Sequence, residues 1–153
     1  MVSSSSYVYA AWVYQDLQEF HSLAQLAIFG CHNLKSIPDL GELCFLTRLA
    51  IQNCSNITRL PEGSLKCLKS VEIGGYCEEL DVFPSLNFIQ HSHMTLEDLE
   101  LKGNLMYLPT TITCLIKLEE LDIWDCSKLK ERCAMGRGAE WLKIAHIPKI
   151  IIR

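Results

Sequence analysis

The chain has 153 residues, of which 49% are hydrophobic and 21% are charged, and its formal net charge is -4. This length suits one domain with its own hydrophobic core, and the acidic balance gives no general argument for binding nucleic acid or an anionic membrane. No apolar run reaches the roughly 18–20 residues that a membrane-spanning helix needs. We therefore expect a folded chain that binds neither nucleic acid nor a membrane.

Residues 1–22 are predicted to form an N-terminal leader or cap. One interpretation is a helix, capped by Ser6, that carries its apolar side chains on one face. These side chains are Tyr9, Trp12, Val13, Leu17 and Phe20. The apolar alternation over residues 7–13 also suits a strand, so both structures stay open. The apolar stretch at residues 7–14 has no positive residue before it, so we do not expect a secretory signal.

Five copies of the pattern L-x-x-L/V-x-I/L follow this segment. They start at Leu23, Leu46, Leu68, Leu96 and Leu118, at intervals of 23, 22, 28 and 22 residues. In each copy two apolar residues are spaced by two, which is the period of a strand with one buried face. Such intervals and such a pattern are typical of leucine-rich repeats, whose stacked copies pair their strands in a parallel sheet.

The repeats therefore predict an α/β fold, namely a leucine-rich-repeat solenoid in the shape of a horseshoe. Its concave face would carry a short parallel sheet, and its convex side would be irregular or carry short helices. About five repeats would occupy residues 23–131, between the N-terminal segment and a C-terminal cap over residues 132–153. The expected strands cover residues 26–28, 49–51, 71–73, 99–101 and 121–123.

Half of the cysteines occupy a fixed place in the repeats, just after each strand. They are Cys31, Cys54, Cys126 and, one residue later in its copy, Cys77. Their spacing does not resemble the paired C-x-x-C ligands of a zinc site, so we interpret them as small buried side chains. A second set is expected to fill the convex side of the core, and it consists of Cys44, Cys67 and Cys114. Without an export signal, we expect reduced thiols and a cytoplasmic location.

Four copies end in an apolar residue followed by proline, which suits a turn into the convex side. These pairs are Ile37-Pro38, Leu60-Pro61, Phe83-Pro84 and Leu108-Pro109. The longest interval contains residues 87–95, which we expect to bulge out as a solvated loop. His91 and His93 could hold a metal there, but no cysteine or carboxylate pair flanks them closely, and the solvated loop is the interpretation we keep.

The sequence carries no motif for catalysis or cofactor binding. It lacks the nucleotide-binding G-x-x-x-x-G-K-S/T, the hydrolase G-x-S-x-G and the zinc-binding H-E-x-x-H. Its acidic pairs are adjacent residues, which point to opposite faces of a strand and make poor acid/base couples. We therefore predict no catalytic, cofactor-binding or metal-binding residue and no enzyme activity.

The stacked strands would place the side chains that flank each apolar pair on the concave face. We expect protein binding there, through nine residues from all five repeats. They are Phe29, Arg48, Glu72, Asp98, Glu100, Lys102, Glu120, Asp122 and Trp124. Trp124 is predicted to be an exposed interface anchor. The alternative is a solvated face that only keeps the repeats soluble.

The predicted face is uneven in charge. Repeats four and five contribute seven carboxylates against the single cation Lys102. The carboxylates are Glu97, Asp98, Glu100, Glu119, Glu120, Asp122 and Asp125. The other end of the face is neutral apart from Arg48. This gradient favours a basic partner surface at the C-terminal end of the face.

The C-terminal cap is expected to close the last repeat. Residues 139–146 are predicted to form a short helix, ended by Pro148, with Trp141 and Ile144 on one face. An extended segment follows at residues 150–152. Gly136 and Gly138 are expected in turns, and His146 in the core. The basic residues of the cap are interpreted as its solvated face, and they are Lys128, Lys130, Arg132 and Arg137.

The end of the chain also resembles a known family. The repeat L-x-x-L-x-I-x-x-C-x-x-L, followed by L-x-x-R-C-x-x-G-x-G-x-x-W-x-K-I-A-H-I-P, is similar to the C-terminal end of plant coiled-coil nucleotide-binding leucine-rich-repeat (NBS-LRR) disease resistance proteins. The matching residues are Leu129, Arg132, Cys133, Gly136, Gly138, Trp141, Lys143, Ile144, Ala145, His146, Ile147 and Pro148. The resemblance covers the chain from about residue 17 onward. Residues 138–141 read G-A-E-W where the family commonly has G-E-D-W.

The resemblance implies a cytoplasmic immune sensor whose repeats recognise a partner and hold a nucleotide-binding switch inactive. The implied partner is a pathogen effector, a guarded host protein or the receptor's own nucleotide-binding module. This chain contains neither the coiled coil nor the nucleotide-binding module. The alternative is a stand-alone leucine-rich-repeat adaptor, such as the substrate-selecting part of a ubiquitin ligase, although residues 1–22 are too short to supply an F-box-like region.

Overall fold

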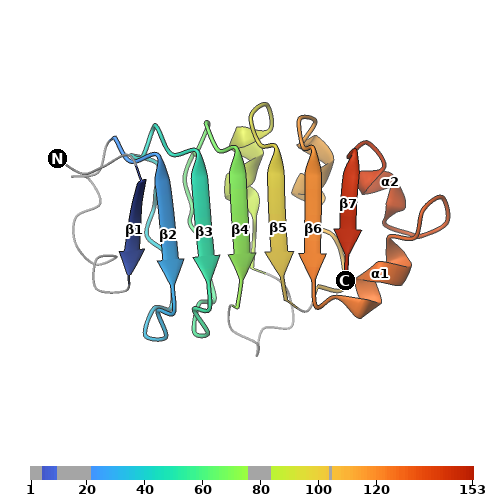
Figure 1. The fold of residues 1–153 in the computed structure, drawn as a ribbon, viewed down its shortest axis with the longest axis horizontal. Helices are drawn as coiled ribbons and strands as arrows, with labels where there is room; N and C mark the ends of the chain where they lie inside the picture. Colours follow the sequence, from blue (N-terminus) through green and yellow to red (C-terminus); the bar gives the residue numbers. More distant parts are fainter. Residues whose placement is uncertain (1–4, 10–21, 76–83, 104) are drawn as a thin grey trace.

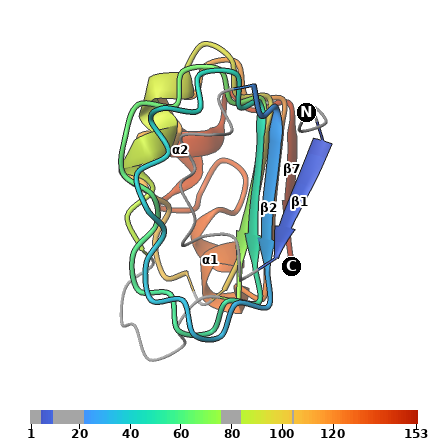
Figure 2. The same cartoon turned by 90° about the vertical axis from the view of Figure 1, so that its left-hand side faces the viewer.

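The computed structural model describes residues 5–9, 22–75, 84–103 and 105–153. In these residues seven strands form one parallel sheet, in which each strand pairs with the next along the chain (Figure 1). The strands are β1 (Ser5–Tyr9), β2 (Gln25–Phe29), β3 (Arg48–Gln52), β4 (Ser70–Gly74), β5 (Asp98–Lys102), β6 (Glu120–Trp124) and β7 (Lys149–Ile152). Short helices and loops cover one face of the sheet (Figure 2). The predicted α/β character and the parallel sheet are confirmed.

All five predicted strands lie within β2–β6, and their pairing follows the repeat. One row of paired residues consists of Leu26, Leu49, Val71, Leu99 and Leu121. A second row, two residues later, consists of Ile28, Ile51, Ile73, Leu101 and Ile123. Every side chain in both rows is buried. A slip of one residue would turn both rows toward solvent, so the apolar pairs fix the register.

The cysteines after the strands are buried, as predicted. The Sγ atoms of Cys31 and Cys54 each lie 3.4 Å from the carbonyl oxygen two residues earlier, and that of Cys126 lies 3.3 Å from the equivalent oxygen. Burial, followed by the neighbouring Cys54, raises the pKa of Cys31 to about 11. These thiols therefore act as small apolar side chains with a weak local hydrogen bond. Cys77 lies outside the described residues.

The second set of cysteines does not fill the core. Cys44 and Cys67 are exposed, and Cys114 is half-buried, with its Sγ 2.9 Å from the carbonyl oxygen of Thr111. The prediction of a core role was wrong for the first two, because leucines already fill that side: Leu43, Leu65 and Leu68 are each at most 2% exposed. A cysteine beside such a leucine is left to face solvent.

A backbone turn with positive φ directly follows each of the strands β2–β6. The residues at this place are Gly30, Asn53, Gly75, Gly103 and Asp125. Glycine, asparagine and aspartate are the residues that adopt this conformation most readily. At Gly75 a Cβ atom would also lie 2.7 Å from the backbone nitrogen of Asn53, so close packing between neighbouring turns requires glycine there.

Two 3₁₀ helices, η3 (Asn87–Ser92) and η4 (Thr110–Cys114), cover part of the buried face of the sheet. The expected solvated loop at residues 87–95 is therefore wrong in part. Phe88, Ile89 and Ser92 are buried, while His91 and His93 are exposed. The Ser92 hydroxyl donates a hydrogen bond to the carbonyl of Leu65 and accepts one from the Leu68 N–H, so this residue ties the segment to the preceding connection.

Each end of the sheet carries a strand beyond the five repeats. β1 pairs with β2 over residues 5–9. Of the two structures left open for the N-terminal segment, the strand is therefore confirmed there and the helix capped by Ser6 is wrong, while residues 10–21 lie outside the described part of the chain. β7 confirms the extended segment expected at residues 150–152 and also pairs with β6. Within the described residues no helix is long and apolar enough to cross a membrane.

The C-terminal cap contains two short helices, α1 (Ser127–Arg132) and α2 (Trp141–Ile144). The second is shorter than predicted, but Ile144 is buried and Trp141 packs against the core as expected. Gly136 has a φ of 74°, and a Cβ atom at Gly138 would lie 2.2 Å from the Arg132 carbonyl oxygen, so both glycines are required by the turn. His146 is exposed rather than in the core, with Nε2 3.3 Å from the Leu115 carbonyl oxygen.

Glu140 is the buried charge that holds this cap together. Its carboxylate lies 2.7 Å from Lys143 Nζ and 3.5 Å from Arg132 Nη2, and it accepts a hydrogen bond from the Leu108 N–H at 3.0 Å. Arg132 also stacks over the Tyr107 ring at 4.5 Å. Arg132 was predicted on the solvated face, and its side chain is only partly exposed there, at 37%. The other basic residues of the cap are exposed as expected.

Candidate functional site

The candidate site is the outer face of the sheet, which is the face opposite to the helices and loops. Three rows of side chains form this face, with the register expected from the repeat. The rows are Gln25, Arg48, Ser70, Asp98, Glu120 and Lys149; Ala27, Ala50, Glu72, Glu100, Asp122 and Ile151; and Phe29, Gln52, Gly74, Lys102 and Trp124. β7 adds Lys149 and Ile151, which the repeat pattern did not predict.

Intramolecular ion pairs flank the carboxylates of this face. Arg48 pairs with Glu72 at 2.9 Å, and Lys149 pairs with Glu120 at 3.1 Å. Gln52 also donates a hydrogen bond to Glu72 at 3.0 Å. Further contacts join Arg153 to Asp122 at 3.4 Å and Lys102 to Asp125 at 3.9 Å. The acidic excess expected for repeats four and five is therefore smaller by two charges, because Lys149 and Arg153 come from outside the repeats.

Within the three rows of the outer face, Asp98 and Glu100 on β5 are the two carboxylates that form no salt bridge within 4 Å among the described residues. Burial raises the pKa of Asp98, and the charges of Glu120 and Glu97 raise it further. Burial likewise raises the pKa of Glu100, with a second contribution from Glu72 and Asp122. The middle of the outer face is therefore a place where added positive charge is favourable.

A shallow hollow of about 260 Å³ lies over this middle part. It brings together six of the nine residues predicted to bind protein. They are Arg48, Glu72, Asp98, Glu100, Glu120 and Asp122. Lys102 and Trp124 follow one row further along β5 and β6. Phe29 lies apart, where it lines a smaller hollow of about 30 Å³ together with Arg48 and Glu72.

Trp124 is half-buried, not exposed as predicted. The guanidinium of Arg153 covers its ring, with the Arg153 Cζ 3.7 Å from the ring centroid. The Trp124 Nε1 and the Asp122 Oδ1 are both buried and have no hydrogen-bond partner in the described structure. Sequence reasoning missed Arg153, since residue 153 follows the last extended segment and no repeat position points to it.

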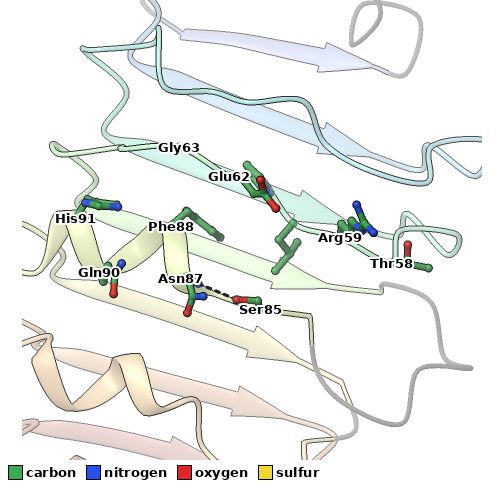
Figure 3. Close-up of a pocket in the computed structure, with 11 residues that line it drawn as sticks. Thr58, Arg59, Glu62, Gly63, Ser85, Asn87, Phe88, Gln90 and His91 are labelled. Atoms are coloured by element: carbon green, nitrogen blue, oxygen red, sulfur yellow. Dashed lines mark hydrogen bonds between the residues drawn. The ribbon is translucent and has the colours of Figure 1, made fainter.

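A second hollow, of about 440 Å³, lies on the opposite side of the molecule between residues 58–63 and η3 (Figure 3). Figure 3 shows Arg59, Glu62 and His91 among its lining side chains. Both charge signs and several neutral polar groups line it, so it favours no one kind of ligand. No group of three or more histidine, cysteine, aspartate or glutamate side chains is placed to hold a metal ion in the part of the chain that the structure describes.

Comparison of the chain with protein-family models, curated proteins and solved structures gives no match.

Proposed function

We propose that the chain is a leucine-rich-repeat solenoid that binds another protein through the outer face of its sheet. The observation that carries this proposal is the pair of carboxylates on β5, Asp98 and Glu100, which lie in a solvent-facing hollow and form no salt bridge with any described residue. Like charges side by side on a sheet destabilise the fold. A basic partner would relieve this repulsion. Binding to such a partner therefore accounts for the two unpaired carboxylates better than a face that only keeps the protein soluble.

The fold class in this proposal is supported by the repeat and by the sheet together. Each repeat contributes one strand and one positive-φ turn, followed by an irregular or 3₁₀ connection or, in the fifth repeat, by the short helix α1, and successive strands pair in chain order. This is the arrangement expected when repeats bury their apolar faces against their neighbours. The outer face would then be the concave face of the solenoid.

We infer that the wider role is that of the recognition and autoinhibition end of a cytoplasmic plant immune receptor. The resemblance of residues 129–148 to the end of NBS-LRR proteins supports this role. Several of the matching residues contribute to the packing of the C-terminal cap. Arg132 and Lys143 hold Glu140 in place, and Gly138 permits the close turn at Arg132. The partner would be a pathogen effector, a guarded host protein or the receptor's own nucleotide-binding module.

The second candidate is a stand-alone adaptor, for example the substrate-selecting part of a ubiquitin ligase. It would use the same outer face, so binding experiments do not separate it from the receptor. The transcript sequence upstream of Met1 does, because a nucleotide-binding P-loop there would support the receptor and an F-box would support the adaptor. In both cases the chain is proposed to be a binding module and not an enzyme.

Charge reversal on β5 tests the proposed binding face. Wild-type protein and the double variant Asp98→Lys/Glu100→Lys are used to capture proteins from plant extract at low salt. The matched control is Glu62→Lys/Glu131→Lys, which makes the same charge change at exposed residues in the β3–β4 connection and in α1. Proteins that bind the outer face should be lost from the β5 variant and kept by the control. Equal recovery by both variants would contradict the proposal.

A further inference from the structure

The outer face already holds one guanidinium, that of Arg153. Its Cζ lies 3.7 Å from the centroid of the Trp124 ring, and its Nη2 lies 3.4 Å from the Asp122 Oδ2. An aromatic face combined with a carboxylate is a combination that binds arginine in particular, because the planar guanidinium stacks on the ring while its N–H groups reach the acid. Trp124 and Asp122 thus form a guanidinium site.

Arg153 fills this site incompletely. It reaches one oxygen of Asp122, at the long end of hydrogen-bond distance, and leaves Oδ1 buried without a partner in the described part of the chain. A well-placed arginine bonds both oxygens of a carboxylate at shorter distances. The Arg153 side chain is itself 51% exposed, so it can leave the site for water at little cost.

The backbone of Arg153 is held independently of its side chain. Its N–H donates to the Ile123 carbonyl at 2.9 Å, and its carbonyl accepts from the Cys126 N–H at 3.1 Å. The strand end would therefore stay in place if the guanidinium moved away. The Arg153 side chain can therefore move off the Trp124 ring while the backbone around it keeps its position.

We propose that the outer face recognises an arginine-bearing segment of its partner and that Arg153 is an internal substitute which this arginine displaces. A partner arginine would stack on Trp124 and bind both oxygens of Asp122. A further cation of the same segment would be drawn to Glu100, which neighbours Asp122 across the β5–β6 pair. This inference rests on the proposed function, since it specifies the chemistry of the partner at the same face.

Displacement gives Arg153 a regulatory effect on affinity. A ligand that needs an unoccupied site binds with an apparent Kd equal to its intrinsic Kd divided by the fraction of molecules in which the site is open. A stacked cation combined with a solvent-exposed ion pair corresponds to a closed-to-open ratio of about four, and therefore to an open fraction of about one-fifth. Removing the Arg153 guanidinium should therefore tighten the binding of an arginine ligand by about fivefold.

The test uses two fluorescein-labelled peptides, Gly-Arg-Gly-Arg-Gly and its lysine counterpart Gly-Lys-Gly-Lys-Gly, with binding followed by anisotropy at low salt. In Arg153→Ala the arginine peptide should bind about fivefold more tightly than to wild type, and its preference over the lysine peptide should grow. Adding Asp122→Asn should remove the gain. Thermal unfolding of each variant shows that the fold is kept.

The matched control is Lys149→Ala, which removes one positive charge from the strand that directly precedes Arg153 but no guanidinium. It should tighten both peptides by the same factor. If Arg153→Ala also tightened both equally, changed neither, or if no variant bound the arginine peptide, the arginine site would be refuted. The two proposals can also fail separately. If a partner protein no longer bound Asp98→Lys/Glu100→Lys but bound Arg153→Ala and Asp122→Asn as well as wild type, the proposed function would stand and this inference alone would be overturned.

Discussion

Replacing Glu140 with alanine is expected to destabilise the fold by about 2–4 kcal/mol. The Glu140 side chain is 6% exposed, and its carboxylate accepts a hydrogen bond from the buried Leu108 N–H at 3.0 Å. Leaving that N–H without a partner costs about 1–3 kcal/mol. The ion pairs with Arg132 and Lys143 together contribute about 1 kcal/mol more and no higher value, because both cations are about one-third exposed and screened by water.

Urea unfolding followed by circular dichroism measures this loss. Glu140→Gln keeps an acceptor for Leu108 and removes only the charge, so it should cost about 1 kcal/mol. Glu131→Ala is the control at an exposed glutamate of α1, and it should change the free energy of unfolding by less than about 0.5 kcal/mol.

The same residue predicts a pH dependence. Burial by itself would raise the pKa of Glu140, but the hydrogen bonds from Lys143 and Leu108, with the charges of Lys143 and Arg132, lower it below its ordinary value. A carboxyl with a lowered folded-state pKa stabilises the protein fully above its unfolded-state pKa. This contribution is lost as the pH falls through the folded-state pKa. The stability of Glu140→Gln should therefore fall less steeply with acid than that of wild type.

Two results would show that the reasoning about Glu140 is wrong. One is a loss below about 0.5 kcal/mol for Glu140→Ala, which would mean that water replaces the carboxylate at Leu108. The other is a parallel loss of stability for wild type and Glu140→Gln on acidification, which would assign the acid sensitivity to other carboxyls.

Three further predictions concern the rest of the fold. Iodoacetamide should alkylate the exposed Cys44 and Cys67 of the native protein first, and Cys31 and Cys133 only after unfolding. The reason is that burial raises the pKa of Cys31 and of Cys133 to about 11. Mass spectrometry after timed quenching measures this order. Ser92→Ala should cost about 1–3 kcal/mol in urea unfolding by removing the bonds to Leu65 and Leu68, whereas His93→Ala at an exposed position should cost little, and equal costs would contradict the assigned bonds. Glu100→Gln should be more stable than wild type at neutral pH, and the difference should shrink as the pH falls, because a raised folded-state pKa makes the native state take up protons more readily; a constant difference would exclude this cause.

The rows of the sheet could be read from the sequence because they depend on local spacing. Two leucine-like residues at positions i and i+2 can share only one face of a strand, and their repetition every 22–28 residues leaves one parallel register that buries all of them. The outer face follows by elimination, and so do its predicted residues from Arg48 to Trp124. The small buried side chains at Cys31, Cys54 and Cys126 follow from the same repetition.

Errors arose where the environment of a residue depends on segments distant in sequence. Residues 87–95 look polar, yet Ser92 is buried because Leu65 and Leu68 offer it a donor and an acceptor. His146 looked apolar in context, yet it faces solvent because Ile144 and Ile147 already fill the core around it. The polarity and spacing of residues along the chain do not show which of several nearby side chains will occupy the core.

The α/β class, the strand register and the acidic character of the outer face follow from the sequence alone, because each depends on a period of two residues repeated through the chain. The pairing of the charges, by contrast, depends on the three-dimensional arrangement of the strands. β7 brings Lys149 and Arg153 beside carboxylates about 30 residues earlier, with Lys149 beside Glu120 and Arg153 beside Asp122 and Trp124. Such pairings follow from which strand becomes the neighbour of which, and no pattern within one segment specifies that.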